Sequence, residues 1–351
     1  MPCGTIPPVG RALRTPLCRE LGIEYPIFSV GFGVAAGPPL VAAVSEAGGF
    51  GVLGASGMKP DEQERRITAL RKLTDKPFGV NIIIDESEEG DREFLVEAVS
   101  TASSLGAAAV VLFWGDPSPY VEGAHRHGAR VMIQVGSVEE AKAAAAAGVD
   151  AVIAQGLEAG GHVRGTTSIW ELLPATVEAV KPLPVLASGG IGDGAGLARA
   201  LRMGAQGVSL GTRFVASNEA WVHPGYKQRV VDATANDTVY NELYDVWWPN
   251  APHRTLRNKT YEEWLAAGSP PPGQRPGEGT SIGKRRTATG DLEEWPRYAV
   301  GTAAPEFDGD IEYAPLWAGE SCSVVNDIKP AAEIVRDLVR DARSALGSAS
   351  V

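Results

Sequence analysis

Residues 183–194 read Leu-Pro-Val-Leu-Ala-Ser-Gly-Gly-Ile-Gly-Asp-Gly, an apolar run followed by a glycine-rich turn. The run is apolar throughout, which is typical of a parallel strand covered on both faces. Eight such runs alternate with alanine-rich helical stretches and predict strands at 25–31, 50–54, 78–84, 108–114, 129–135, 150–155, 183–188 and 206–211. Their number and spacing predict an α/β fold, a closed (β/α)₈ TIM barrel. A doubly wound open sheet is the alternative.

The composition of the 351-residue chain limits the classes of function. A formal net charge of −11 argues against a nucleic-acid-binding surface. No stretch approaches the roughly 20 apolar residues that span a bilayer, and the first residues lack the apolar core of a signal peptide. Cys3, Cys18 and Cys322 form no CxxC pair and no HExxH spacing occurs, so we expect neither a disulfide framework nor a metal site. We therefore predict a cytoplasmic protein without nucleic-acid or membrane partners.

The composition changes after residue 214, and six of the eight tryptophans lie between Trp221 and Trp317. We predict a barrel over 15–220, a mainly helical or irregular insertion over 221–320 that caps the catalytic face, and a C-terminal helix within 321–351 that returns to the barrel. In the insertion we expect helices at 233–244 and 261–267 and an unpacked, deletable loop at 268–290. A place outside the barrel, or at the subunit contact of a homodimer, is the alternative for this segment.

Glycine-rich turns follow the predicted strands six, seven and eight. Glycine lets the backbone turn sharply and brings its N–H groups close to a phosphate. In TIM barrels a phosphate site recurs at the loops after strands seven and eight. Gly189 and Gly190 after strand seven, with Gly211 and Thr212 after strand eight, therefore predict a phosphate-binding cradle. Tight turns without a ligand are the alternative.

His162 ends the loop after strand six, directly behind two glycines that leave room for a flat ligand. An imidazole at the catalytic face can serve as a base or a hydrogen-bond donor near neutral pH. We predict that His162 is catalytic, and a structural histidine is the alternative. Glu158 is expected either to orient His162 or to be solvated. His223 and His253 fall in the insertion and receive no role.

Three motifs together resemble the nitronate monooxygenase family, formerly called 2-nitropropane dioxygenases. They are Ala154-Gln-Gly-Leu-Glu-Ala-Gly-Gly-His162, Ala187-Ser-Gly-Gly-Ile191 and Leu210-Gly-Thr-Arg-Phe214. The segments 17–27, 42–51, 256–258, 316–319 and 327–334 are also similar to that family, so the resemblance covers nearly the whole chain.

The resemblance implies an FMN cofactor and assigns residues to it. Asn81 and Gln155 would contact the flavin ring, and Gly160 with Gly161 would lie against it. The loop that contains Ser29 and Gly31 would lie beneath the flavin ring. The phosphate would be held by Gly189, Gly190, Ser209, Leu210, Gly211 and Thr212, and His162 would be the family's catalytic histidine.

The implied reaction is FMN-dependent oxidative denitrification of alkyl nitronates, or of nitroalkanes, to a carbonyl compound and nitrite with O₂. Two features depart from the family. Many members carry a proline–methionine pair where this chain has Ser29-Val-Gly-Phe-Gly33, and Trp114 is bulkier than expected and should narrow the pocket. The Ala-Gly-Gly-His tetrad is shared with related reductases. An NAD(P)H-dependent flavin reductase acting on quinones or enoyl thioesters is therefore the alternative, and a flavin-binding protein without turnover is a third hypothesis.

Overall fold

A computed structural model describes residues 13–86, 90–286 and 291–347 of the chain. Its centre is an eight-stranded parallel sheet in the order β1-β9-β8-β6-β5-β4-β3-β2. The strands are β1 Ile27–Ser29, β2 Gly51–Gly54, β3 Phe78–Ile83, β4 Ala109–Phe113, β5 Arg130–Val135, β6 Ala151–Gln155, β8 Val185–Ser188 and β9 Gly207–Leu210. Each coincides with a predicted strand, because each is a short apolar run ended by a turn.

The sheet closes into a barrel between its first and last strands. Phe50, next to β2, donates its N–H to the Ile27 carbonyl at 2.8 Å and accepts from the Ser29 N–H at 3.1 Å. On its other side β1 pairs with β9, with Ile27 opposite Val208. The predicted TIM barrel is therefore confirmed, and the open doubly wound sheet is excluded.

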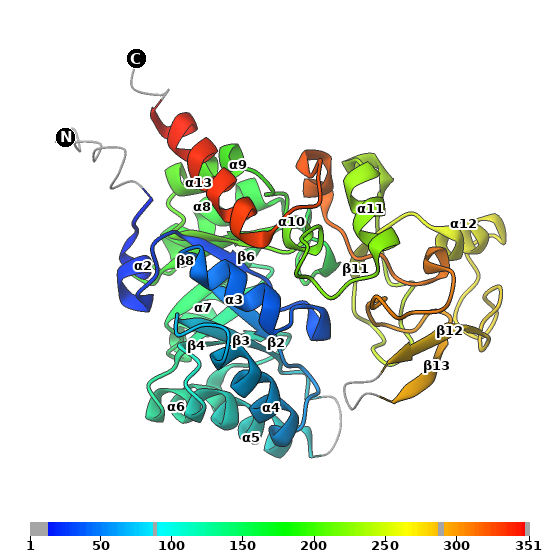
Figure 1. Ribbon diagram of the computed structural model, residues 1–351, viewed down its shortest axis with the longest axis horizontal. Coiled ribbons are helices and arrows are strands. Elements are labelled where there is room, and N and C mark those ends of the chain that lie inside the picture. Colours follow the sequence, from blue (N-terminus) through cyan, green and yellow to red (C-terminus); the bar gives the residue numbers. More distant parts are fainter. Residues whose placement is uncertain (1–12, 87–89, 287–290, 348–351) are drawn as a thin grey trace.

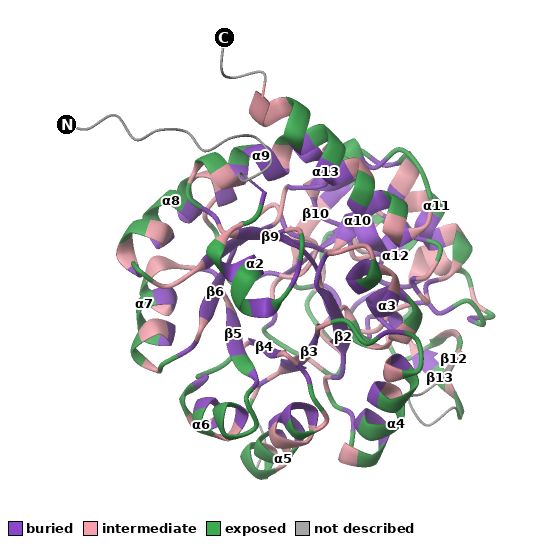
Figure 2. Ribbon diagram, turned by 60° about the vertical axis from the view of Figure 1, so that its left-hand side comes forward, coloured by how far each residue is buried: buried purple, intermediate pink, exposed green. Residues whose placement is uncertain are grey.

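Helices cover the outside of the barrel, as Figure 2 shows by the buried strands inside a ring of helices with exposed outer faces. Their bounds are α3 Pro38–Glu46, α4 Pro60–Arg71, α5 Asp91–Ser104, α6 Ser118–Arg126, α7 Val138–Ala146, α8 Ile169–Ala179 and α9 Gly194–Arg202. The C-terminal helix α13, Ala331–Gly347, lies against α9, where Gly194 leaves no room for a side chain beside the Ala342 backbone. Pro330 directly precedes α13.

The barrel interior is filled with side chains and closed at one end by α2, Pro16–Leu21. Leu17, Cys18 and Leu21 of α2 pack with Phe28, Phe50 and other strand residues that point into the barrel. Thr15 caps the start of α2, and Gly22 ends it in a left-handed conformation with φ +69°. Because one end is plugged, ligand chemistry belongs to the opposite end, where the strands finish.

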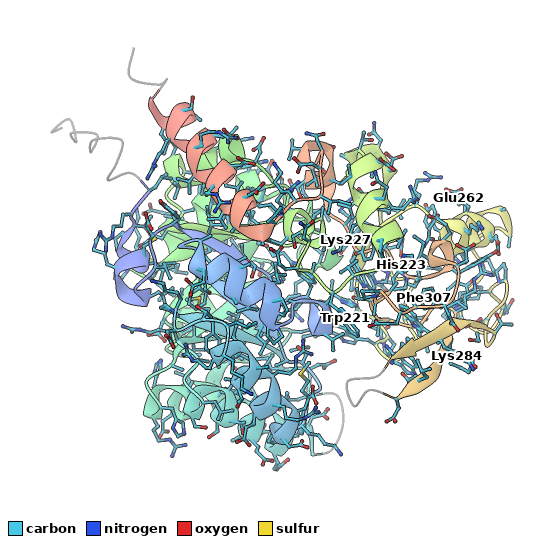
Figure 3. The ribbon with its side chains drawn as sticks, viewed as in Figure 1. Trp221, His223, Lys227, Glu262, Lys284 and Phe307 are labelled. Carbon is cyan, nitrogen blue, oxygen red and sulfur yellow. The ribbon has the colours of Figure 1, made fainter. Side chains whose placement is uncertain are left out.

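The insertion begins at a junction on the barrel (Figure 3). The Trp221 N–H donates to the Ala35 carbonyl at 3.0 Å, and the Lys227 ammonium donates to the Ser217 carbonyl at 2.6 Å. The short helix α10, Thr212–Val215, follows β9 and precedes the insertion. The insertion then includes α11 Pro224–Asp232, β10 Thr238–Asn241, β11 His253–Leu256, α12 Lys259–Ala266, β12 Ser281–Arg286 and β13 Leu292–Pro296. In Figure 1 it extends from the barrel to the right. The part boundaries 15–220, 221–320 and 321–351 stay a prediction.

Two sequence predictions for the insertion are wrong. Residues 233–244 are not a helix, because the Thr234–Asp237 capping box closes only one short turn and the following Thr-Val-Tyr run forms β10. Residues 268–286 are not an unpacked loop. Arg275 is buried and donates to Asp245 and the Leu243 carbonyl, and β12 pairs with β13. Residues 287–290 and Cys3 lie outside the described residues. The helix expected at 261–267 is confirmed as α12.

Candidate active site

The His162 loop is held in place by the insertion. The short strand β7, Gly161–His162, pairs antiparallel with β11, so that His162 lies opposite His253 and Gly161 opposite Arg254. The Val163 N–H extends this ladder to the Pro252 carbonyl at 2.8 Å. The loop after β6 is therefore fixed by a sheet that joins two distant parts of the chain.

Gln155, the last residue of β6, fixes the same loop through two side-chain hydrogen bonds. Its side-chain Nε2 donates to the His162 carbonyl at 2.8 Å, and its Oε1 accepts from the Arg164 N–H at 3.2 Å. The side chain is 3% exposed. Gln155 therefore positions His162, and its predicted contact with a flavin ring stays a prediction.

Aromatic rings surround the His162 imidazole. Trp248 lies closest, with 4.0 Å between ring centroids, and Trp317 and Trp114 lie at 5.3 and 6.0 Å. Trp248 and Trp317 both come from the insertion, so this segment covers His162. Trp247 behaves differently, because it is 53% exposed and stacks on the Arg285 guanidinium at 4.4 Å.

The imidazole of His162 is held neutral by its surroundings. Burial, and secondarily the neighbouring His253, lowers the pKa of His162 to about 3. Its Nε2 atom is buried and has no hydrogen-bond partner among the described residues. A buried polar atom without a partner carries a desolvation cost, so it marks a place where a ligand atom would be stabilising.

His253 has the opposite character, although burial also lowers its pKa to about 4. Its Nδ1 lies 2.9 Å from the Ala251 carbonyl, which can only accept, and its Nε2 accepts from the Tyr244 N–H at 3.2 Å. Both nitrogens are satisfied, which is typical of a structural histidine. Sequence reasoning missed His253 because only the β7–β11 pairing brings it beside His162.

The glycines of the predicted cradle lie at the ends of two neighbouring strands, since Ser188 of β8 pairs with Ser209 of β9. Gly189 and Gly190 have left-handed φ values of +94° and +67°. Among the described residues, none accepts a hydrogen bond from the backbone N–H of Gly189, Gly190 or Gly211. These donors are thus available to an anion.

The space at these glycines differs from one to the next. At Gly211 an added methyl group would meet nothing nearer than Val30 at 3.8 Å, whereas at Gly189 it would lie 2.9 Å from the Ala159 nitrogen. Thr212 has its hydroxyl engaged, because Oγ1 accepts from the Gly319 N–H at 3.0 Å. The structure therefore brings the four cradle residues to one edge of the barrel.

The remaining residues predicted to contact the cofactor belong to β1, the loop after it, β3 and β9. Ser29 uses its hydroxyl to accept from the Val52 N–H at 3.0 Å, and Asn81 donates to the Val111 carbonyl at 2.9 Å. Gly31 is packed against Asn81, since a methyl group there would lie 2.5 Å from the Asn81 Cβ. Ser209 and Leu210 are buried at the end of β9, where Leu210 lies opposite Ser29 in the β1–β9 pairing. Their contacts with a cofactor stay predictions.

Gly160 and Gly161 are glycines for different reasons. A methyl group on Gly160 would lie 2.3 Å from the Gly319 nitrogen, so this residue packs directly against the backbone of 318–319. Gly161 has φ +75° and nothing within 4 Å of such a group. Glu158 does not contact His162, because its carboxylate accepts from the Ser168 hydroxyl and the Ile169 N–H.

Other kinds of site are not seen in the described part of the chain. Within residues 13–86, 90–286 and 291–347, no three His, Cys, Asp or Glu side chains are grouped so as to hold a metal ion. Of the helices that the structure describes, none is long and apolar enough to cross a membrane.

The fold is a TIM barrel, and the candidate site lies at the carboxyl ends of its strands. The sequence model of the nitronate monooxygenase family matches residues 14–341. The chain therefore belongs to the nitronate monooxygenase family, and the resemblance seen in the sequence is confirmed.

Known proteins similar to this chain are named for different activities. It is 30% identical to a nitronate monooxygenase of Paraburkholderia phytofirmans, over 93% of this chain and 94% of that protein. It is 34% identical to the (3aS,4S,5R,7aS)-5-hydroxy-7a-methyl-1-oxo-octahydro-1H-indene-4-carboxyl-CoA dehydrogenase of Mycobacterium tuberculosis, over 96% of this chain and 98% of that protein. The solved structure of FabK from Thermotoga maritima is 33% identical with a TM-score of 0.79, covering 96% and 98% of the two chains. The protein is thus an oxidoreductase, as the sequence predicted.

Proposed function

We propose that the protein is an FMN-dependent nitronate monooxygenase, which converts an alkyl nitronate to a carbonyl compound and nitrite with O₂. The observation that carries this proposal is the neutral imidazole of His162, whose buried Nε2 has no partner among the described residues and which tryptophans flank beside a glycine cradle. Family membership supports the reaction class.

The cradle residues fit the phosphate of FMN. The backbone N–H groups of Gly189, Gly190 and Gly211 are without protein acceptors, and Gly211 is open to close approach. Asn81 and Gln155 would lie toward the ring. Only one cradle is evident among the described residues, which suits a mononucleotide better than FAD. When bound, the flavin supplies the redox chemistry by taking electrons from the substrate, while the protein supplies binding and orientation.

The lowered pKa of His162 favours an already ionised substrate. A general base works best with a pKa near the operating pH, and the pKa of His162 is lowered to about 3. The neutral ring is therefore a weak base toward the α-carbon of a nitroalkane. It can still donate one hydrogen bond to a nitronate oxygen. We infer that His162 holds and orients the nitronate anion.

The enclosure around His162 has a second consequence. Trp248 and Trp317 cover the imidazole and limit the access of water to it. In a water-poor site a hydrogen bond to an anion is stronger than in solvent. The two indole rings would thus strengthen the hydrogen bond from His162 to the nitronate.

One observation favours a second candidate. The relative from Mycobacterium tuberculosis is named as a CoA dehydrogenase at 34% identity. This keeps open an oxidoreductase acting on thioesters, including the NAD(P)H-dependent flavin reductases of quinones or enoyl thioesters.

The proposal is tested on the purified protein by two assays. Heat-released cofactor should chromatograph as FMN, and propyl-1-nitronate in air should yield nitrite. Recovery of FAD, or nitrite release no faster than without protein, would contradict the proposal.

A further inference from the structure

A cavity of about 240 Å³ lies beside the His162 site. It opens between the ends of β4 and β5 and the start of α7. Its lining includes the apolar side chains of Ile133, Val135 and Ala144 and the charged side chains of Asp116, Glu140 and Arg164.

Trp114 belongs both to this cavity and to the His162 cluster. It lines the cavity wall. Its ring also meets His162 edge-on at 6.0 Å and Trp248 at 5.1 Å, and neither of these residues lines the cavity. The indole therefore stands between the cavity and the imidazole.

The indole is held in this position by its neighbours. Trp114 has φ +72°, a left-handed conformation that is rare for a large side chain and persists only where the surroundings enforce it. The next residue, Gly115, lies so close to Ile84 that a methyl group would come within 2.3 Å of the Ile84 carbonyl oxygen. On the ring itself, the Arg164 guanidinium stacks at 4.9 Å.

Arg164, which stacks on the Trp114 ring, is itself held by an ion pair. Its guanidinium donates to Glu140 Oε1 at 2.7 and 3.1 Å, and Glu140 Oε2 accepts from the Gly136 N–H at 2.7 Å. The ion pair compensates the charges of Glu140 and Arg164. The remaining charged side chain of the lining is Asp116, an anion whose Oδ1 accepts from the Ser118 N–H and hydroxyl. The cavity therefore suits an alkyl chain better than a second anionic group.

We propose that Trp114 is a specificity-determining residue, a partition that keeps the chain of the substrate out of this cavity and restricts the site to short alkyl anions. The inference rests on the proposed function for the nature of the anion. Its consequence is that removal of the indole joins the cavity to the His162 site and admits longer chains.

The test measures binding, so that it does not depend on turnover. Butanoate and octanoate carry a planar two-oxygen anion like that of a nitronate and differ only in chain length. Their Kd values are measured by calorimetry on the purified holoprotein and on Trp114→Gly, since glycine accepts the left-handed backbone at 114 without strain. In the wild-type protein octanoate should bind no tighter than butanoate. In Trp114→Gly it should bind at least about tenfold tighter, because each buried methylene is worth about fourfold.

Two further variants make the result specific. In Trp114→Gly combined with Ala144→Leu, the leucine fills part of the cavity, so the preference for octanoate should fall back toward the wild-type ratio. Trp114→Leu, which keeps part of the bulk, should lie between the two. An octanoate preference already present in the wild-type protein, or one unchanged by Trp114→Gly in a protein that keeps its cofactor, overturns the inference. Nitrite release from propyl-1-nitronate by the wild-type protein is scored separately and decides the proposed function alone.

Discussion

The adjacent glycines before His162 offer a matched pair of substitutions. In Gly160→Ala the new methyl group would lie 2.3 Å from the Gly319 nitrogen and 2.4 Å from the Ala318 carbonyl carbon, both of them backbone atoms. The segment must move, and the hydrogen bond from the Gly319 N–H to Thr212 is then strained. Overpacking costs about 1–3 kcal/mol, and a lost hydrogen bond adds about 1 kcal/mol. We expect Gly160→Ala to lower the free energy of unfolding by about 2–4 kcal/mol.

Gly161→Ala is the control, because it meets no neighbour within 4 Å and suffers only from its φ of +75°. That conformation costs an alanine about 1–2 kcal/mol, and the stiffer unfolded chain returns about 0.4–1 kcal/mol. The free energy of unfolding is measured by urea denaturation of the cofactor-free proteins. If Gly160 is a glycine only to admit a flavin, Gly160→Ala would lose flavin affinity without destabilising the cofactor-free protein. A Gly160→Ala protein as stable as Gly161→Ala would therefore refute the packing argument.

Three further predictions concern the cofactor, the His162 imidazole and the tryptophans of the insertion. Gly190→Asp should lose bound flavin because it places a carboxylate beside the phosphate, whereas Gly268→Asp, at a left-handed glycine outside the cradle, should keep it; equal flavin absorbance in both would refute the cradle. His162→Asn should keep the flavin but lower turnover of the nitronate by about 10–150-fold, which is what a hydrogen bond to a charged group is worth. In the wild-type protein the rate with preformed nitronate should stay flat between about pH 5 and 8, since the lowered pKa leaves the ring neutral until about pH 3; an inflection near 6.5 would contradict this. Trp248→Ala should raise KM for the nitronate by weakening the cover on His162, while Trp247→Ala, at an exposed ring, should not; equal effects on KM would refute the distinction.

The barrel was predictable from the sequence because its strands are local apolar runs, each ended by a glycine or a polar turn. The edge on which the cradle glycines meet followed from strand order alone, since neighbouring parallel strands end on the same side. His162 could be singled out for the same reason. These inferences need only short-range patterns and the rule that barrel sites lie at strand ends.

The environment of His162 could not be predicted, since it depends on contacts between distant segments. The pairing of His162 with His253 joins strands from two parts of the chain, and nothing local to either residue specifies it. Residues 233–244 failed as a helix because β10 is stabilised by its partner β11 rather than by local propensity. Arg275, within a run rich in proline and glycine, is buried by its ion pairs with Asp245 and Glu278, which a turn-rich composition does not reveal.

Anaerobic mixing tests most directly whether a bound flavin beside the neutral His162 takes electrons from a nitronate. Without O₂, the flavin spectrum is followed after the holoprotein meets propyl-1-nitronate, NADH or NADPH in separate experiments. We predict that the nitronate bleaches the flavin rapidly in the wild-type protein and much more slowly in His162→Asn, and that neither nicotinamide bleaches it on that time scale. Rapid bleaching by NADH or NADPH with no response to the nitronate would contradict the proposed function and identify a reductase.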